Sequence, residues 1–148
     1  MPLSMIHESL DGWGIFASHT GVESDIKTPG GSDFELPGLS DSIQQATVYY
    51  ENGGFEARVS MRHRDDFKGD LYGLGFSVEQ YTMLSETIVD AQLSYDLADA
   101  GIANLEGLRV YAQGVNLTDE PFTSLNGGQI RDYQEYGENY RVGFSYNF

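Results

Sequence analysis

The chain has 148 residues, and its 23 acidic side chains outnumber the 8 basic ones to give a net charge of −15. We therefore expect it to bind neither nucleic acid nor an anionic membrane surface. Hydrophobic residues make up 40% of the chain and aromatic residues 13%, which indicates a folded, β-rich protein rather than a disordered one. The absence of cysteine excludes disulfides, zinc–thiolate sites and thiol catalysis.

The chain shows no internal linker, so we treat residues 1–148 as one region. It has no run of about 18 apolar residues that could form a transmembrane helix. The first eight residues, MPLSMIHE, lack both the basic and the apolar part of a signal peptide. If the protein is exported, we expect this chain to be a fragment or its true start to lie upstream.

Apolar residues recur at every second position in segments of about ten residues, which predicts strands with two different faces. The clearest segment is 54–64, where Phe55 and Val59 fall on one face and Arg58 and Arg62 on the other. About six such segments are present, and in chain order they span residues 11–22, 43–51, 54–64, 87–97, 108–117 and 140–148.

The connections between these segments alternate in length. Asn52-Gly53 predicts a two-residue type I′ hairpin turn, and residues 98–106 form a second short connection. The other three connections, residues 23–42, 65–86 and 118–139, are long and polar. Short turns at one end and long loops at the other are typical of outer-membrane β-barrels, whose short turns face the periplasm.

Aromatic and basic residues fall on opposite faces of the predicted strands. Near the short turns, the apolar faces carry the aromatic residues Trp13, Tyr50, Phe55, Tyr95, Tyr146 and Phe148. This arrangement predicts a lipid-facing aromatic girdle. The opposite faces carry the arginines Arg58, Arg62, Arg109 and Arg141. A basic residue at the lipid-facing midplane costs about 2–4 kcal/mol, so we expect these arginines to face a polar lumen, balanced by carboxylates such as Glu56, Asp90 and Asp96.

Two C-terminal segments together resemble a known family. Residues 115–122 read VNLTDEPF and residues 136–148 read YGENYRVGFSYNF, which is similar to the C-terminal end of TonB-dependent outer-membrane receptors. The segments LPGLS at 36–40, YYEN at 49–52 and RHRDDF at 62–67 are also similar to late barrel strands of that family. Glu138 departs from the pattern, because the family often has arginine after the glycine that matches Gly137.

The resemblance implies an all-β fold: the C-terminal part of an antiparallel up-and-down transmembrane β-barrel of about 22 strands. Alone, the chain would form an open curved sheet. It implies a place in the Gram-negative outer membrane and a part in active uptake of a scarce nutrient of the siderophore, cobalamin or oligosaccharide class. The implied partners are outer-membrane lipid, the N-terminal barrel and plug that this chain lacks, the TonB system through that absent N-terminus, and the barrel-assembly machinery. Phe148 would belong to the C-terminal signal that this machinery reads.

Two other interpretations remain open. The chain could be a complete eight-stranded outer-membrane barrel, or a soluble secreted β-sandwich that acts as a binding module. Neither the histidines nor the scattered carboxylates have the spacing of a metal site or a catalytic pair. We therefore expect no enzyme activity, no metal site and no cofactor.

Overall fold

The computed structural model describes residues 1–27, 33–34, 36–72, 78–98, 105 and 107–147. Within these residues the fold is all-β, and every paired strand is antiparallel. In the same residues, no helix is long and apolar enough to cross a membrane. The all-β fold class expected from the sequence is confirmed.

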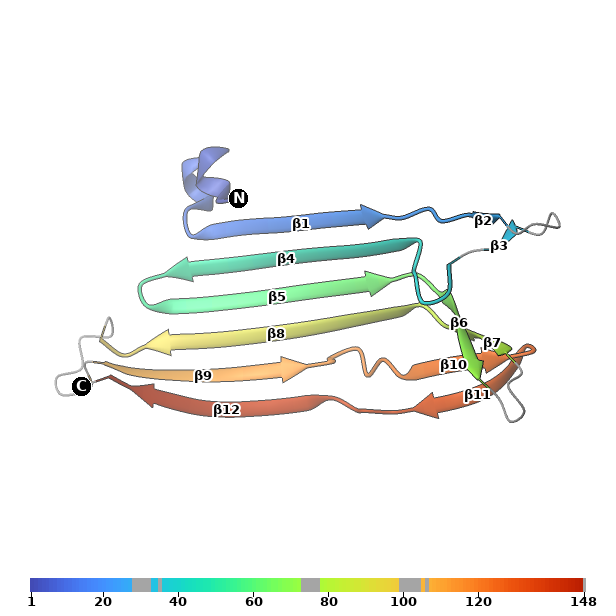
Figure 1. The fold of residues 1–148 in the computed structure, drawn as a ribbon. Coiled ribbons are helices and arrows are strands. Elements are labelled where there is room, and N and C mark those ends of the chain that lie inside the picture. Colours follow the sequence, from blue (N-terminus) through green and yellow to red (C-terminus); the bar gives the residue numbers. More distant parts are fainter. Residues whose placement is uncertain (28–32, 35, 73–77, 99–104, 106, 148) are drawn as a thin grey trace.

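The main sheet has six strands in the order β1-β4-β5-β8-β9-β12, so each strand lies beside its neighbour in chain order (Figure 1). Its members are β1 (Trp13–Gly21), β4 (Ser42–Asn52), β5 (Phe55–Arg64), β8 (Glu86–Asp96), β9 (Leu108–Val115) and β12 (Asn139–Tyr146). These are the six predicted segments. The sheet does not close, because β1 and β12 occupy its two edges.

The strand register places the apolar positions of all six strands on the same side. Tyr50 of β4 lies opposite Trp13 on one side and Ala57 on the other. The same row continues through Leu93 and ends beyond β9 at Val142 of β12. A slip of one residue in any pair would move a strand's apolar side chains to the other face. The predicted alternation therefore agrees with the register of every pair.

The turn between β4 and β5 lies at the end of the sheet where β8 ends and β9 begins (Figure 1). The turn between β4 and β5 is type I′-like, as predicted, but its central residues are Gly53 and Gly54 rather than Asn52 and Gly53. Asn52 pairs with Phe55, and both glycines have positive φ angles, 54° and 75°, which such a turn requires. At this end two short 3-10 turns, η1 (Leu3–Met5) and η2 (Glu8–Leu10), also precede β1.

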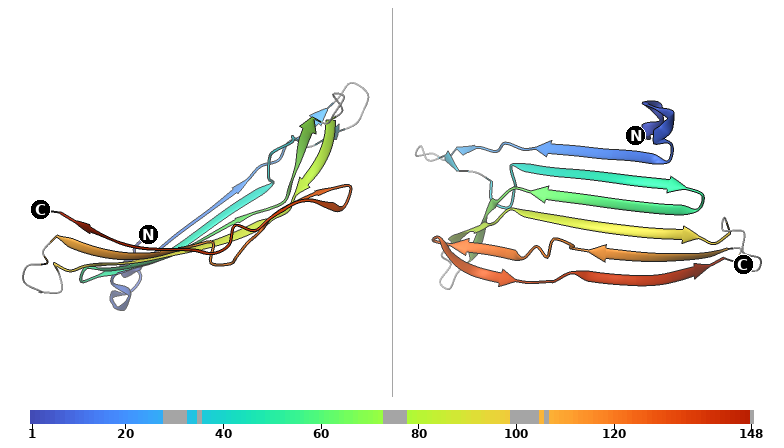
Figure 2. Two further views of the ribbon diagram at one scale, coloured as in Figure 1. Left: turned by 90° about the horizontal axis from the view of Figure 1, so that it is seen from below. Right: turned by 180° about the vertical axis from the view of Figure 1, so that it is seen from behind.

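The long connections contain strands that the sequence did not predict. Their hairpins are β2 (Ile26–Lys27) with β3 (Asp33–Phe34), β6 (Phe67–Tyr72) with β7 (Val78–Met83), and β10 (Phe122–Asn126) with β11 (Gln129–Gln134). Because β7 also pairs with β10, two of these hairpins form one outer sheet in the order β11-β10-β7-β6. In Figure 2, β6 and β7 turn away from the plane of the main sheet.

The main sheet is a single layer (Figure 2). Among the described residues, Met83 in the outer sheet is the one buried hydrophobic side chain. On the apolar side of the main sheet, Leu93 is 51% exposed and Val142 85% exposed. The β-sandwich interpretation requires a second sheet packed against this side, and the described part of the chain supplies none.

Candidate functional site

The main sheet has an apolar face and a polar face, and the two differ in chemistry. We define the apolar face as Trp13, Ile15, Ala17, Ala46, Val48, Tyr50, Phe55, Ala57, Val59, Met61, Val89, Ala91, Leu93, Tyr95, Val110, Ala112, Tyr140, Val142, Phe144 and Tyr146. The intervening residues of the same strands form the polar face.

Five of the six aromatic residues predicted for the girdle lie on the apolar face near the short turns. The rings of Trp13 and Tyr50 are 5.0 Å apart, and those of Tyr50 and Phe55 are 6.3 Å apart. Tyr95 lies directly opposite Phe55, and Tyr146 lies opposite Leu108. The sixth, Phe148, lies outside the described residues, so its predicted role in assembly stays a prediction.

The positions of these aromatic residues along the strands shift steadily from β1 to β12. In the strand register, the Phe55–Tyr95 pair lies two residues further along the strands than the row that contains Trp13 and Tyr50. Tyr146 lies two residues further again in the same direction. In a barrel, strands about 4.8 Å apart and tilted about 35–45° shift a horizontal level by about one residue per strand. A shift of about four residues over five strand-to-strand steps fits one horizontal ring in a tilted barrel wall.

The four predicted arginines lie on the polar face, and two of them pair with carboxylates. Arg109 forms an ion pair with Glu56, which also accepts a hydrogen bond of 3.2 Å from Ser94. Arg62 and Arg64 share Glu86, at N–O distances of 3.7 and 3.3 Å. Glu86 was missed because its place opposite Arg64 becomes clear only from the strand register.

Asp90 and Asp96, which were expected to balance arginines, have other hydrogen-bond partners. Asp90 accepts a hydrogen bond of 2.9 Å from the backbone N–H of Asn116. Asp96 accepts one of 3.0 Å from the N–H of Ala98, just after β8.

The remaining two arginines share one row of the polar face. This row runs across five strands through Tyr49, Arg58, Gln92, Gln113 and Arg141. No described carboxylate forms an ion pair with Arg58 or Arg141, although the Nε of Arg141 donates a 3.1 Å hydrogen bond to Asn139. The row therefore offers two guanidinium groups and two amides to whatever faces this side of the sheet.

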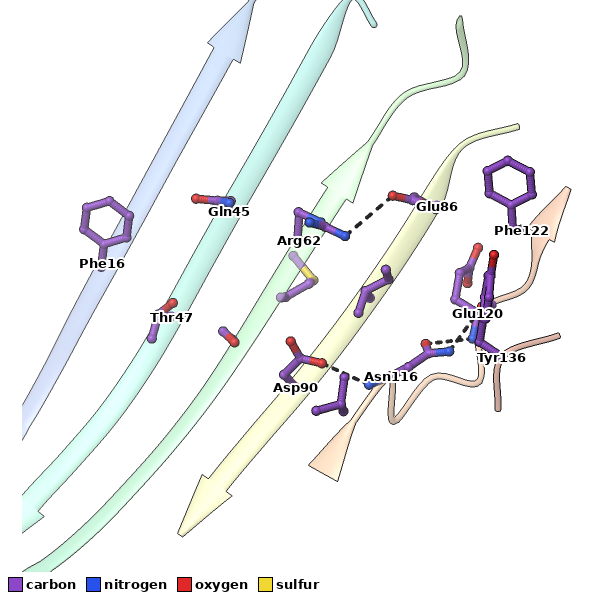
Figure 3. Close-up of a pocket in the computed structure, with 14 residues that line it drawn as sticks. Phe16, Gln45, Thr47, Arg62, Glu86, Asp90, Asn116, Glu120, Phe122 and Tyr136 are labelled. Carbon is purple, nitrogen blue, oxygen red and sulfur yellow. Dashed lines mark hydrogen bonds and ion pairs between the residues drawn. The ribbon is translucent and has the colours of Figure 1, made fainter. Parts of the chain in front are cut away.

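A cavity of about 500 Å³ is open on the polar face, toward the end with the long connections (Figure 3). Its walls combine aromatic, amide, hydroxyl and charged groups, a mixture that suits a polar ligand with some apolar surface. The lining includes Phe16, Gln45, Thr47, Ser60, Arg62, Glu86, Asp90, Asn116, Glu120, Phe122 and Tyr136. Arg62 and Glu86 face each other across its upper part, whereas Asp90 and Asn116 meet at its lower wall (Figure 3).

Asn116 is the most heavily hydrogen-bonded residue of this cavity. Its φ angle is 56°, in the left-handed region that asparagine tolerates better than most residues, and it is only 9% exposed. Its side-chain amide donates to the carbonyls of Glu120 (3.2 Å) and Gly137 (3.4 Å), and its Oδ1 accepts from the N–H of Glu120 (3.0 Å). Asn116 thus joins the end of β9 to the approach to β12.

The two residues after Asn116 form hydrogen bonds that connect the end of β9 to β8. The N–H of Leu117 donates to the carbonyl of Val89 (2.8 Å), and the hydroxyl of Thr118 donates to the carbonyl of Thr87 (2.8 Å). The segment that carried the family resemblance therefore has a structural role, which its motif alone did not reveal.

Two glycines on the polar face make room for tyrosines on neighbouring strands. A Cβ at Gly14 of β1 would overlap the ring of Tyr49 on β4, and one at Gly143 of β12 would overlap Tyr111 on β9. These pairs hold the two edge strands against their neighbours. Alternation could not predict them, because they depend on which residues lie opposite one another.

The described residues contain no group of three or more His, Cys, Asp or Glu side chains that could hold a metal ion. In the outer sheet, the hydroxyl of Tyr133 donates a 2.6 Å hydrogen bond to Glu135, which raises the pKa of this phenol above its ordinary value.

Comparisons with protein-family models, with curated proteins and with solved structures found no match to this chain.

Proposed function

We propose that this chain is the C-terminal part of the β-barrel of a TonB-dependent receptor in a Gram-negative outer membrane. The observation that carries the proposal is the unpartnered apolar face, which is aligned across all six strands of a single-layered sheet. A water-soluble sheet would expose these side chains at a large cost in free energy, whereas hydrocarbon surrounds them without that cost.

The strand lengths support a membrane-spanning sheet. The central strands β4, β5 and β8 have 11, 10 and 11 residues. Ten residues that rise about 3.3 Å each and tilt by about 40° span about 25 Å, the height of the apolar band of an outer-membrane barrel. Aromatics at the short-turn end and hairpins at the other end agree with a periplasmic and an extracellular side.

The polar face would then line the lumen. In such a receptor this face meets the plug domain and the incoming nutrient, and the family's substrates are siderophores, cobalamin and oligosaccharides. Arg58 and Arg141 would meet anionic groups of the plug or substrate, and the cavity around Asn116 would lie on the path from the extracellular loops. Transport would need the plug, the remaining barrel strands and the TonB system, so these six strands would not transport alone.

A test compares lipid exposure at two adjacent positions of β5 in the receptor reconstituted into lipid vesicles. Spin labels would be attached to Val59→Cys on the apolar face and to Ser60→Cys on the polar face. We expect the label at residue 59 to collide mainly with oxygen dissolved in the lipid, and the label at residue 60 mainly with a water-soluble nickel complex. Equal water exposure at both positions would rule out the membrane assignment.

Native mass and behaviour in detergent-free buffer separate the other two interpretations. A complete eight-stranded barrel would give the same labelling pattern, but its native mass would be close to that of this chain and it would carry no plug. A soluble β-sandwich would give a monodisperse protein in detergent-free buffer. The main sheet has six strands and no second layer among the described residues, so neither alternative has a structural feature in its favour.

A further inference from the structure

Part of the outer edge of β1, the edge away from β4, is paired with the first two residues of the chain. The amino group of Met1 donates to the carbonyl of Ile15 (2.6 Å), and the N–H of Ile15 donates to the carbonyl of Met1 (3.0 Å). Pro2 forms an antiparallel bridge with Gly14. Met1 and Pro2 therefore lie along β1 on the side away from β4.

The details of this pairing match those of a strand end. Met1 and Ile15 exchange both backbone hydrogen bonds, so they form the hydrogen-bonded type of antiparallel pair. Pro2 then falls at the other type of pair, where its missing N–H is not needed. Met1 lies opposite Ile15 of the apolar face, and it is itself apolar.

The residues that follow have the position of a hairpin connection. Between Pro2 and the start of β1, η1 and η2 reverse the chain at the end of the sheet that holds the Gly53–Gly54 turn (Figure 1). The carbonyl of Gly12 accepts from the N–H of Glu51 (2.8 Å), which fixes this connection to β4. It thus resembles another short turn of the same periplasmic side.

We infer that the edge of β1 binds an antiparallel strand that ends at Pro2, in the register set by Met1 and Ile15. This inference rests on the proposed function, in which the polypeptide immediately preceding Met1 supplies the strand. The residue directly before Met1 then lies opposite Phe16, the second opposite Ala17 and the third opposite Ser18. The second residue should be apolar, because Ala17 belongs to the apolar face.

Backbone N–H and C=O groups on the outer side of β1 are positioned to pair with such a strand. Because Ile15 directs its N–H and C=O away from β4, the alternation of an antiparallel strand directs those of Ala17 and His19 the same way. In the described part of the chain, no strand pairs with that side of either residue. Hydrocarbon cannot satisfy these groups, so a bilayer strongly favours a strand at this edge.

A second copy of this chain is the competing occupant. β12 of another copy would also be antiparallel to β1, because β1 and β12 run in opposite directions at the two edges (Figure 1). That arrangement would have to displace Met1 and Pro2 from the edge. The pairing already formed at Ile15 favours the preceding segment of the same polypeptide.

Disulfide formation in the receptor, expressed with its encoded upstream segment in outer membranes, tests the register. One variant joins Ser18→Cys with a cysteine at the third residue before Met1. Matched controls join Ser18→Cys with a cysteine at the first or the fifth residue, on the same face. A shift of two residues moves the Cα atoms about 7 Å along the strand and out of disulfide range, so we expect the first variant to cross-link at least about tenfold faster.

Equal or faster cross-linking in a control would overturn the register while leaving the proposed function intact. A disulfide-linked dimer formed between Ser18→Cys and Ser145→Cys would identify a second copy as the occupant and overturn the inference. N-terminal sequencing of the native protein provides the separate check. A mature chain that begins at Met1 would refute both the preceding strand and the receptor assignment, whereas the labels at residues 59 and 60 test the membrane assignment independently. Heat-modifiable migration on gels confirms that each variant is folded.

Discussion

The ring of Tyr49 on β4 occupies the space that a side chain on Gly14 of β1 would need. The pair lies next to the point where Pro2 bridges to β1, so it supports the edge strand at the place where that strand meets the N-terminal residues. A small residue on one strand and a large ring on the next form a fixed cross-strand contact, which helps to set the register.

Replacing Gly14 by alanine should therefore destabilise the sheet. The added methyl group would displace the Tyr49 ring, and overpacking of this kind costs about 1–3 kcal/mol. Gly21→Ala is the matched control, because a Cβ there would meet its nearest neighbour, a ring nitrogen of His19, at 3.7 Å. Urea unfolding in lipid vesicles measures both variants. Equal losses would contradict the close contact, and Tyr49→Ala should recover part of the loss at Gly14.

Asn116→Ala should weaken the joint between β9 and β12. The change removes side-chain hydrogen bonds to Glu120 and Gly137 and places alanine at a φ angle of 56°. We expect a loss of about 1–3 kcal/mol and faster amide exchange at Leu117. The control is Asn126→Ala, since the amide of Asn126 makes one exposed hydrogen bond of 3.4 Å to Glu79. A similar loss at both positions would argue against the role of Asn116.

The two faces of β5 should respond differently to an added charge. Val59→Arg places a guanidinium on the apolar face, and its transfer to hydrocarbon should cost about 2–4 kcal/mol. Ser60→Arg, on the polar face, should cost much less. Folding yields and unfolding free energies in lipid vesicles provide the measurement. If arginine is tolerated equally well at 59 and 60, the apolar face does not contact lipid.

The ion pair between Arg109 and Glu56 should contribute modestly to stability. Both side chains are partly exposed, 39% and 45%, so solvent screens the attraction. A double-mutant cycle with Arg109→Met and Glu56→Gln should give a coupling free energy of about 0.2–1 kcal/mol that falls at high salt. A coupling of zero at low salt would mean that the two groups do not interact in the folded protein.

The main sheet was predictable because its signal is local. Alternation within each segment predicts a strand and its faces, and for β8 the predicted range 87–97 differs by one residue from Glu86–Asp96. The β4–β5 turn was displaced by one residue because Asn52-Gly53 and Gly53-Gly54 are both good type I′ sequences. In that case pairing of Asn52 with Phe55 decides the position.

The outer sheet and the polar-face contacts were not predictable in the same way. β7 and β10 come from different connections and pair directly at only two positions, Met83–Ser124 and Thr82–Leu125, so no single segment carries their signal. The Glu86 ion pairs and the Tyr49–Gly14 contact depend on register between strands. The lipid-facing, lumen-facing and assembly roles of the predicted site residues stay predictions.

Because β7 pairs with β10, the β6–β7 and β10–β11 hairpins form one sheet and should move together. Ser124, opposite Met83, is 1% exposed and donates a 2.9 Å hydrogen bond to Asp132, so the junction is held from both sides. A displacement of β6 and β7 should therefore also displace β10. Through β10 it should affect the hydrogen bonds by which Asn116 connects the end of β9 to the segment before β12. A molecule that binds either hairpin should therefore displace both, and the displacement should also reach β9 and β12 of the main sheet.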